Sequence, residues 1–156
     1  MPQQIDVDTT SFLILYIARL LRAELERRVA DAHLGITPGE ARTLANVARF
    51  GPLRQHDLAD LAGLGAMSVT TVLDRLEKAG LIRRDADSND RRAKLVSVTG
   101  AAAPLLIQLR TIGDEVRSIT RGKLATDDWE SFRSLLKVAR DNHLNARRDQ
   151  GGMGAA

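Results

Sequence analysis

The segment from Leu53 to Thr99 constrains the fold of this chain most, because its apolar periodicity changes from helical to strand-like around well-placed turn residues. It predicts a helix over residues 53–62, a glycine turn over 63–65 and a second helix over 66–79. A strand over 81–84, a charged tip over 85–92 and a second strand over 94–98 follow. Two helices joined by such a turn form a helix-turn-helix, whose second helix enters the major groove in proteins that bind DNA. The segment therefore favours a DNA-binding regulator over an enzyme.

A long amphipathic helix is predicted ahead of this segment, from about Ser11 to Ala32, with Thr9 or Thr10 as its cap. Six apolar residues recur at helical spacing: Leu13, Ile17, Leu20, Leu21, Leu25 and Val29. Further apolar residues near its start lie on other faces, which indicates an additional partner such as a second subunit. Thr37-Pro38-Gly39-Glu40 then predicts a helix start with a capping box, and Gly51-Pro52 its end.

Two helices are predicted after the strands. The first runs from about Gly100 to Leu124, and the second is capped at Thr126-Asp127-Asp128. The second helix should bury the apolar residues Trp129, Phe132, Leu135, Leu136 and Ala139. Packing both ends of the chain together, and against a second copy, would bury the apolar faces that remain, which predicts a symmetric dimer.

The expected fold class is mainly α with a small β-hairpin wing: a winged helix-turn-helix flanked by N- and C-terminal dimerisation helices. The expected regions are an N-terminal dimerisation helix, the winged helix-turn-helix, the C-terminal dimerisation helices and a flexible tail, over residues 1–36, 37–99, 100–147 and 148–156.

Composition excludes several classes of function. The chain has 156 residues and no cysteine, which excludes disulfides, thiolate zinc sites and cysteine redox sensing. Its net charge of +3 permits nucleic-acid binding without indicating it. The histidines His33, His56 and His143 are too scattered for a metal site, and no nucleophile motif or phosphate loop occurs. We therefore expect no metal, no cofactor and no enzyme.

The sequence predicts neither a targeting segment nor a membrane span. Its longest apolar run, Phe12 to Ala18, is too short to span a bilayer. Asp6 and Asp8 stand near the N-terminus, where a signal peptide would have basic residues. We therefore expect a cytoplasmic protein without membrane contact.

The central segment contains a set of motifs with a common spacing: Leu34-Gly35-Ile36-Thr37-Pro38, Gly51-Pro52-Leu53, Asp57-Leu58-Ala59, Val69-Thr70, Asp74 to Arg84, and Asp90 to Thr99. Through these motifs the sequence resembles the MarR (multiple antibiotic resistance regulator) family of winged helix-turn-helix transcription factors. The resemblance implies a homodimer that binds a pseudo-palindromic operator in double-stranded DNA. It also implies a repressor that a small anionic or phenolic ligand releases.

The resemblance places the recognition helix at residues 66–79 and the wing at 85–92. In the family an Asp-x-Arg arrangement at the wing tip holds an arginine toward the minor groove, and Asp90 and Arg92 match it here. The chain departs from many relatives at Gly65-Ala66-Met67, where they have charged or polar residues, and at Thr71, where arginine is frequent. The lack of cysteine excludes the thiol-peroxide-sensing branch.

The candidate DNA-binding residues are Arg54, Gln55, Met67, Ser68, Thr70, Thr71, Arg75, Lys78, Asp90, Arg91, Arg92 and Lys94. Arg54 and Gln55 begin a helix and suit phosphate, the helix residues suit base edges, and a wing arginine suits a narrow A·T-rich minor groove. Three alternatives stay open. The first is that Arg75 and Lys78 pair with the neighbouring acids Asp74 and Glu77 on a solvated helix face. The second is that the wing arginines Arg91 and Arg92 form an ordinary charged hairpin tip. The third is that Asp90 is only a turn residue.

A ligand site is predicted on the first helix, where Phe12 and Tyr16 would line a pocket and Arg19 would face an anion. The alternative is that the two rings pack in the core or the dimer seam.

Two functions other than DNA binding are alternatives for this sequence. A winged-helix protein-interaction module that does not bind DNA would suit the nearly neutral recognition helix, and the salt dependence of DNA binding separates the two. A small helical enzyme has no supporting residues.

Overall fold

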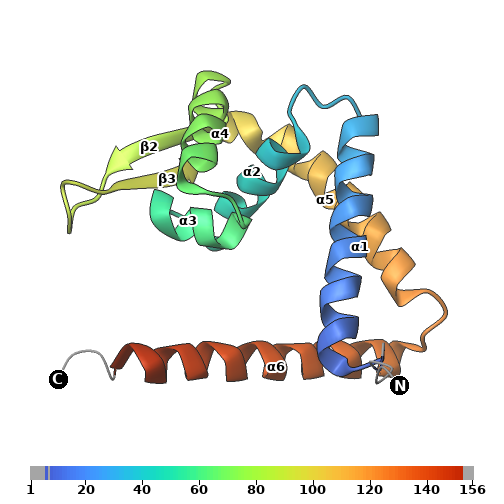
Figure 1. Ribbon diagram of the computed structural model, residues 1–156. Coiled ribbons are helices and arrows are strands. Elements are labelled where there is room, and N and C mark those ends of the chain that lie inside the picture. The colour runs from blue at the N-terminus through green and yellow to red at the C-terminus, as the bar shows by residue number, and fades with distance from the viewer. Residues whose placement is uncertain (1–5, 7, 153–156) are drawn as a thin grey trace, which may run out of the picture. The chain divides into compact units, whose positions relative to one another are not determined.

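The computed structural model describes residue 6 and residues 8–152, with side chains described up to residue 149. These residues form a mainly helical chain with one three-stranded antiparallel sheet, which confirms the expected fold class (Figure 1). The chain divides after Arg117 into two compact units, and α5 (Ala103–Arg121) runs across the division. No helix in the described part of the chain is both long and apolar enough to cross a membrane.

The winged helix-turn-helix lies in the first unit. Its elements are α2 (Pro38–Phe50), β1 (Leu53–Arg54), α3 (Gln55–Ala62), α4 (Ala66–Lys78), β2 (Ile82–Ala86) and β3 (Lys94–Val98). The sheet order is β1-β3-β2. Figure 1 shows the β2–β3 hairpin extending away from the helices as a wing.

The prediction that a helix begins at Leu53 is wrong. Leu53 and Arg54 form β1, which pairs antiparallel with β3, Leu53 with Val96 and Arg54 with Leu95. Helix α3 therefore starts only at Gln55. The backbone of Leu53 and Arg54 forms its hydrogen bonds with β3, which lies far along the chain. Local periodicity cannot show such a tertiary contact. The same sheet extends β2 to Ala86, opposite Lys94.

Local signals set the helix ends as predicted. The Thr37 hydroxyl accepts a hydrogen bond from the Glu40 amide at 3.2 Å, and the Glu40 carboxylate accepts one from the Thr37 amide at 2.9 Å. This confirms the capping box at the start of α2. Gly63 and Gly80 adopt left-handed φ angles of 62° and 72° after α3 and α4. Glycine adopts this conformation without steric strain, so both helices can turn sharply into the next element.

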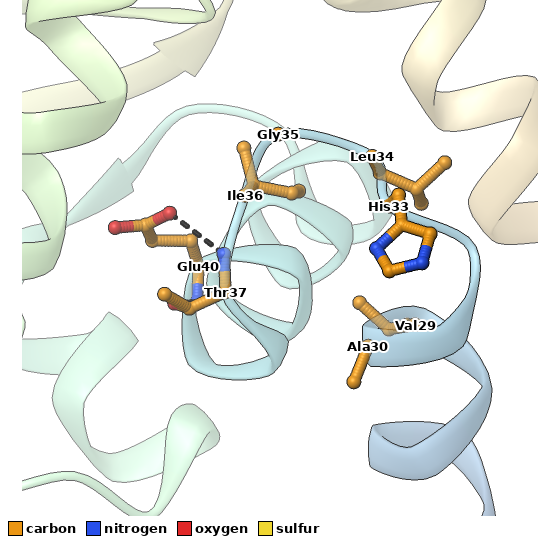
Figure 2. Close-up of a pocket in the computed structure, with 8 residues that line it drawn as sticks. All are labelled: Val29, Ala30, His33, Leu34, Gly35, Ile36, Thr37 and Glu40. Atoms are coloured by element: carbon orange, nitrogen blue, oxygen red, sulfur yellow. Dashed lines mark hydrogen bonds between the residues drawn. The ribbon is translucent and has the colours of Figure 1, made fainter.

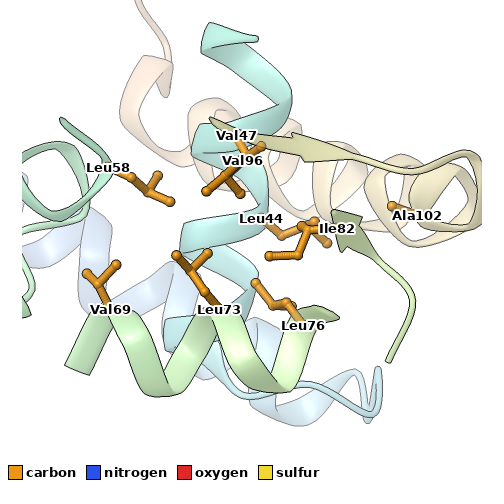
Figure 3. Close-up of a cluster of buried hydrophobic side chains, with 9 residues drawn as sticks. All are labelled: Leu44, Val47, Leu58, Val69, Leu73, Leu76, Ile82, Val96 and Ala102. Carbon is orange, nitrogen blue, oxygen red and sulfur yellow. The ribbon is translucent and has the colours of Figure 1, made fainter. Parts of the chain in front are cut away.

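The hydrophobic core lies beneath α4. Figure 3 shows its buried side chains directed toward one another: Leu44, Val47, Leu58, Val69, Leu73, Leu76, Ile82, Val96 and Ala102. Val69, Leu73 and Leu76 come from one side of α4 and are at most 1% exposed. Burying these branched side chains against α2, α3 and the sheet fixes which side of α4 remains outside.

Helix α1 (Thr10–Asp31) begins after the N-cap Thr9 and joins the first unit through its C-terminal turns. Val29 packs with Ala41 and Ile112 in a second, smaller cluster. Arg28 forms ion pairs with Glu24 and Glu115. The N-terminal half of α1 exposes a row of large apolar side chains: Phe12, Leu13, Ile14, Leu15, Tyr16, Ile17 and Leu20. The described residues therefore cover the apolar side chains of this half only in part.

The second unit consists mainly of α6 (Thr126–Gly152). Trp129 is buried and its ring lies 5.7 Å from that of Phe132, whereas Leu135 and Leu136, expected to be buried, are 68% and 42% exposed in the single chain. Helix α6 continues to Gly152, through residues expected to begin a flexible tail; residues 153–156 lie outside the described part. The preceding helix begins with a 3-10 turn at Gly100–Ala102 and ends at Arg121 rather than Leu124.

We predict that Leu73→Ala lowers the free energy of unfolding by about 2–5 kcal/mol, because it leaves a cavity beneath α4 where Leu73 is fully buried. Urea unfolding followed by circular dichroism measures the change. The control Met67→Ala removes a side chain that is 85% exposed on the same helix and should change stability by less than about 0.5 kcal/mol. Equal effects of the two substitutions would contradict the assigned core.

Candidate nucleic-acid interface

The outer side of α4 is the surface predicted to read DNA. Met67 is 85% exposed, and Ser68, Thr70, Thr71 and Lys78 are also exposed. The hydroxyls of Thr70 and Thr71 donate to the backbone carbonyls of Ala66 and Met67 at 3.1 and 3.2 Å. The Thr71 hydroxyl can still accept a hydrogen bond from a base amino group, and the Thr70 hydroxyl, which also accepts one from Gln55, has one lone pair left. The surface is therefore small, weakly polar and accessible.

Gln55 connects the two helices of the motif. Its side-chain amide donates to the Thr70 hydroxyl at 2.7 Å. Gln55 thus ties the start of α3 to the exposed side of α4, beside the surface predicted to contact DNA.

Arg75 bonds to neither of the acids next to it. Its guanidinium lies 3.6 Å from the Glu40 carboxylate while the side chain stays 64% exposed. Glu40 is also the capping-box residue of α2, so one buried carboxylate links the start of α2 to the recognition helix. The alternative in which Arg75 pairs with Asp74 and Glu77 is not what the structure shows.

Asp74 and Glu77 instead hold Arg84 on β2. The Arg84 guanidinium donates to Glu77 at 3.1 and 2.5 Å and to Asp74 at 2.6 Å, and its side chain is only 17% exposed. The hydrogen bonds from Arg84 lower the pKa of Glu77 below its usual range. Sequence reasoning gave Arg84 no role of its own. The available signal was the position of Asp74 and Glu77 one helical turn apart, just before the Gly80 turn.

Arg54 has a protein partner as well. Its guanidinium donates to one oxygen of Asp87 at 2.9 and 2.6 Å. Asp87 is 5% exposed and its other oxygen accepts from the Asn89 amide at 2.9 Å. The Asn89 amide and then Arg54 lower the pKa of Asp87. Arg54, predicted to contact phosphate, therefore also ties the start of α3 to the wing.

Asp90 shapes the wing turn. Its carboxylate accepts a hydrogen bond from the Arg92 backbone amide at 3.0 Å, and its carbonyl accepts from the Ala93 amide at 2.9 Å. Asp90 thus bonds to the backbone of Arg92 in an Asx turn, and not to the guanidinium that the Asp-x-Arg arrangement would hold toward the minor groove. Arg91 and Arg92 are exposed, and within the described residues neither forms an ion pair. Lys94 is exposed too, and its charge helps to lower the pKa of Glu77.

The three residues of the predicted ligand site form a stack along α1. The rings of Phe12 and Tyr16 lie 5.5 Å apart and nearly parallel, and the Arg19 guanidinium lies 4.8 Å from the Tyr16 ring centre. Phe12 and Tyr16 are 44% and 43% exposed in the single chain. None of these three side chains lines the hollow between α1 and α2.

An open hollow of about 580 Å³ occurs instead where α1 meets α2 (Figure 2). It is lined by Val29, Ala30, His33, Leu34, Gly35, Ile36, Thr37 and Glu40. His33 has a left-handed φ of 48°, which is uncommon for a residue with a side chain. The sequence indicated only that His33 is no metal ligand and did not predict this hollow, because the shape of the loop determines it. Within the described residues, no cluster of three or more acidic or histidine side chains could hold a metal.

The fold and the surface together define a winged helix-turn-helix protein. Residues 36–94 match the sequence model of the MarR family. The solved transcriptional regulator PA3341 is 28% identical with a TM-score of 0.73, over 88% of this chain and 99% of its own. The chain thus has the fold of the MarR-family transcriptional regulators, and residues 36–94 are its MarR-family domain. The resemblance seen in the sequence is confirmed.

Two more distant structures share this fold. A MarR-family regulator from Silicibacter pomeroyi is 21% identical with a TM-score of 0.75, over 88% of this chain and 92% of its own. BpsR of Bordetella bronchiseptica, whose DNA binding is regulated by 6-hydroxynicotinic acid, is 19% identical with a TM-score of 0.67, over 90% of this chain and 99% of its own. At this identity the likeness concerns the fold alone.

We predict a specific pH dependence for the Asp87 interaction. Because its folded pKa is lowered, the ionised carboxylate stabilises the fold above the ordinary Asp value of about 3.9, and this contribution disappears as pH falls through the folded pKa. The melting temperature of the unaltered chain should therefore exceed that of Asp87→Asn at neutral pH, and the difference should shrink as the pH falls below the ordinary Asp value of about 3.9. A difference that stays constant over this range would contradict the assignment.

Proposed function

We propose that this chain is a dimeric, sequence-specific, double-stranded DNA-binding transcriptional regulator, acting as a repressor that a small ligand releases. One observation supports DNA binding most. The exposed side of α4 has accessible groups for base edges, and the adjacent wing has two arginines, Arg91 and Arg92, that no carboxylate of the described chain neutralises. Groove contacts would provide sequence preference and arginine–phosphate contacts would provide affinity.

The exposed apolar surface supports a dimer. Leu15 and Leu20 of α1 are 71% and 48% exposed, and Leu135 and Val138 of α6 are 68% and 57% exposed. A large apolar surface of this kind is costly in water, and a symmetric contact between two copies would bury it. Two recognition helices would then face half-sites about one helical turn, roughly 34–36 Å, apart.

The stack of Phe12, Tyr16 and Arg19 supports an anionic aromatic ligand. The rings offer a stacking surface and Arg19 offers a cation. BpsR, which shares the fold, responds to 6-hydroxynicotinic acid, an aromatic molecule with a carboxylic group. A ligand of this class would act by shifting the dimer between two separations of its recognition helices.

The nearly neutral surface of α4 supports a second candidate, a protein-interaction module that does not bind DNA. Met67 is the most exposed apolar side chain there, and Arg75 is partly engaged by Glu40. Binding to DNA must weaken steeply as salt rises. A winged helix that uses only protein partners would select no duplex at any salt concentration.

We predict that Arg92→Ala weakens binding by about 1–3 kcal/mol and lowers the slope of log K against log salt by about 1, because one counterion-releasing contact is lost. The measurement is fluorescence anisotropy on a duplex that the unaltered chain selects from a random library. The control Arg27→Ala removes an arginine that Glu24 and Asp31 already pair on α1, and should leave affinity unchanged. Unchanged binding by Arg92→Ala would refute the role of the wing arginine.

We predict that the chain sediments as a dimer and that Ile17→Glu/Leu20→Glu makes it a monomer, because two carboxylates would enter the apolar seam. Analytical ultracentrifugation measures both states. Met67→Glu, at a more exposed apolar position on α4, should leave the dimer intact. A folded monomer for the unaltered chain would exclude the proposed assembly.

A further inference from the structure

Two arginine–carboxylate clusters connect the wing to the rest of the winged helix. In the first, named here the α4 clamp, Arg84 of β2 bonds to Asp74 and Glu77 of α4. In the second, the α3 clamp, Arg54 just before α3 bonds to Asp87, the residue that follows β2. The clamps therefore attach one strand of the hairpin to two different elements.

The burial of these groups distinguishes them from ordinary surface pairs. The Arg84 side chain is 17% exposed, and the Asp87 side chain is 5% exposed. By contrast, the neighbouring pair of Arg83 and Asp85 is 69% and 59% exposed. A charge withdrawn from water is costly unless its partners are well placed, so the partner of a buried charge restricts where that charge can lie.

The positions of the clamps along the hairpin restrict its angle. Arg84 pairs with Val96 in the sheet, and Ala86, the last residue of β2, pairs with Lys94. The α4 clamp therefore holds the middle of β2, and the α3 clamp holds the start of the tip. A two-stranded ribbon is only marginally stable by itself, and β1 adds just two residues to the sheet. Two attachment points on different elements limit both bending and rotation of the ribbon.

We propose that Arg84 and Asp87 are positioning residues that set the angle at which Arg91 and Arg92 of the wing meet DNA. This inference rests on the proposed function. Neither residue is proposed to contact DNA. Arg84 acts by holding the hairpin against α4, and Asp87 by holding it against Arg54 of β1, at the start of α3. The clamps also pair the inner arginines Arg54 and Arg84 with carboxylates, so that within the wing loop the unpaired arginines are those at the tip, Arg91 and Arg92.

The direction of the change in DNA affinity distinguishes a positioning role of the clamps from a purely electrostatic one. Replacing a clamp carboxylate by its amide removes negative charge near a polyanion, so electrostatics alone would tighten DNA binding. Loss of a clamp would weaken binding instead, because the wing arginines would meet the groove in many orientations. The two explanations thus predict opposite directions.

The experiment compares three variants: Asp74→Asn/Glu77→Gln for the α4 clamp, Asp87→Asn for the α3 clamp, and Asp85→Asn as the matched control. The probes are a duplex that the unaltered chain selects from a random library, and the same duplex with its outer A·T pairs changed to G·C. Affinity is measured on both duplexes over a range of salt concentrations. The concentration of active protein is set by stoichiometric titration, so that a smaller folded fraction does not count as weaker binding.

We expect each clamp variant to bind the selected duplex roughly tenfold more weakly despite its added positive charge. The preference for outer A·T pairs should fall, because the wing is proposed to read the narrow minor groove. The slope of log K against log salt should not decrease, because no phosphate contact is removed. The control should bind as tightly as the unaltered chain, or more tightly. Clamp variants that bind equally or more tightly, with the A·T preference retained, would overturn the proposal.

A measurement without DNA separates this proposal from the proposed function. The Asp87 amide donates to the Ala93 carbonyl at 3.1 Å, and the Ala93 amide donates to the Asp90 carbonyl at 2.9 Å. Hydrogen exchange at these two wing positions should be faster in the clamp variants than in the control, while exchange in α2 stays unchanged. Unchanged exchange would refute the clamps themselves. A duplex library from which the unaltered chain selects nothing would refute DNA binding, and the positioning role with it.

Discussion

The burial of one side of α4 is the constraint on which the rest of the structure depends. Val69, Leu73 and Leu76 lie in the core with Leu44 and Leu58, so the helix has a single stable orientation and its polar, Met67-bearing side faces outward. The capping box at the start of α2 and the left-handed glycines after α3 and α4 fix the helix ends that allow this packing. A surface of few, weakly polar groups can read DNA only if its orientation is fixed in this way.

The arginines of the winged helix fall into two groups, those paired with a carboxylate of another element and those exposed without one. Arg54, Arg75 and Arg84 have carboxylate partners from other elements, and these partners tie α2, α3, α4 and the wing together. Arg91 and Arg92, beyond the last attachment, stay in water. Arginine thus has two roles in this stretch of chain: some arginines connect elements, and others are left exposed for a partner. The distance of each arginine from an acidic side chain decides its role.

Much of the fold follows from local sequence. Thr37 and Glu40, Gly80, and the alternation over 94–98 predict their caps, turn and strand, because each depends on neighbours within a few residues. The β1 strand and the bonds of Arg54 with Asp87 and of Arg75 with Glu40 do not follow, since their partners are more than 30 residues away. The DNA and ligand contacts of the candidate residues remain predictions, because the single chain contains neither partner.

Hydroxyl-radical footprinting on a selected duplex tests most directly the claim that paired copies of α4 and the wing bind one side of DNA. The account predicts two protected stretches on the same face, with centres about one helical turn, roughly 34–36 Å, apart. A single protected stretch, or none at protein concentrations that saturate the duplex, would contradict it.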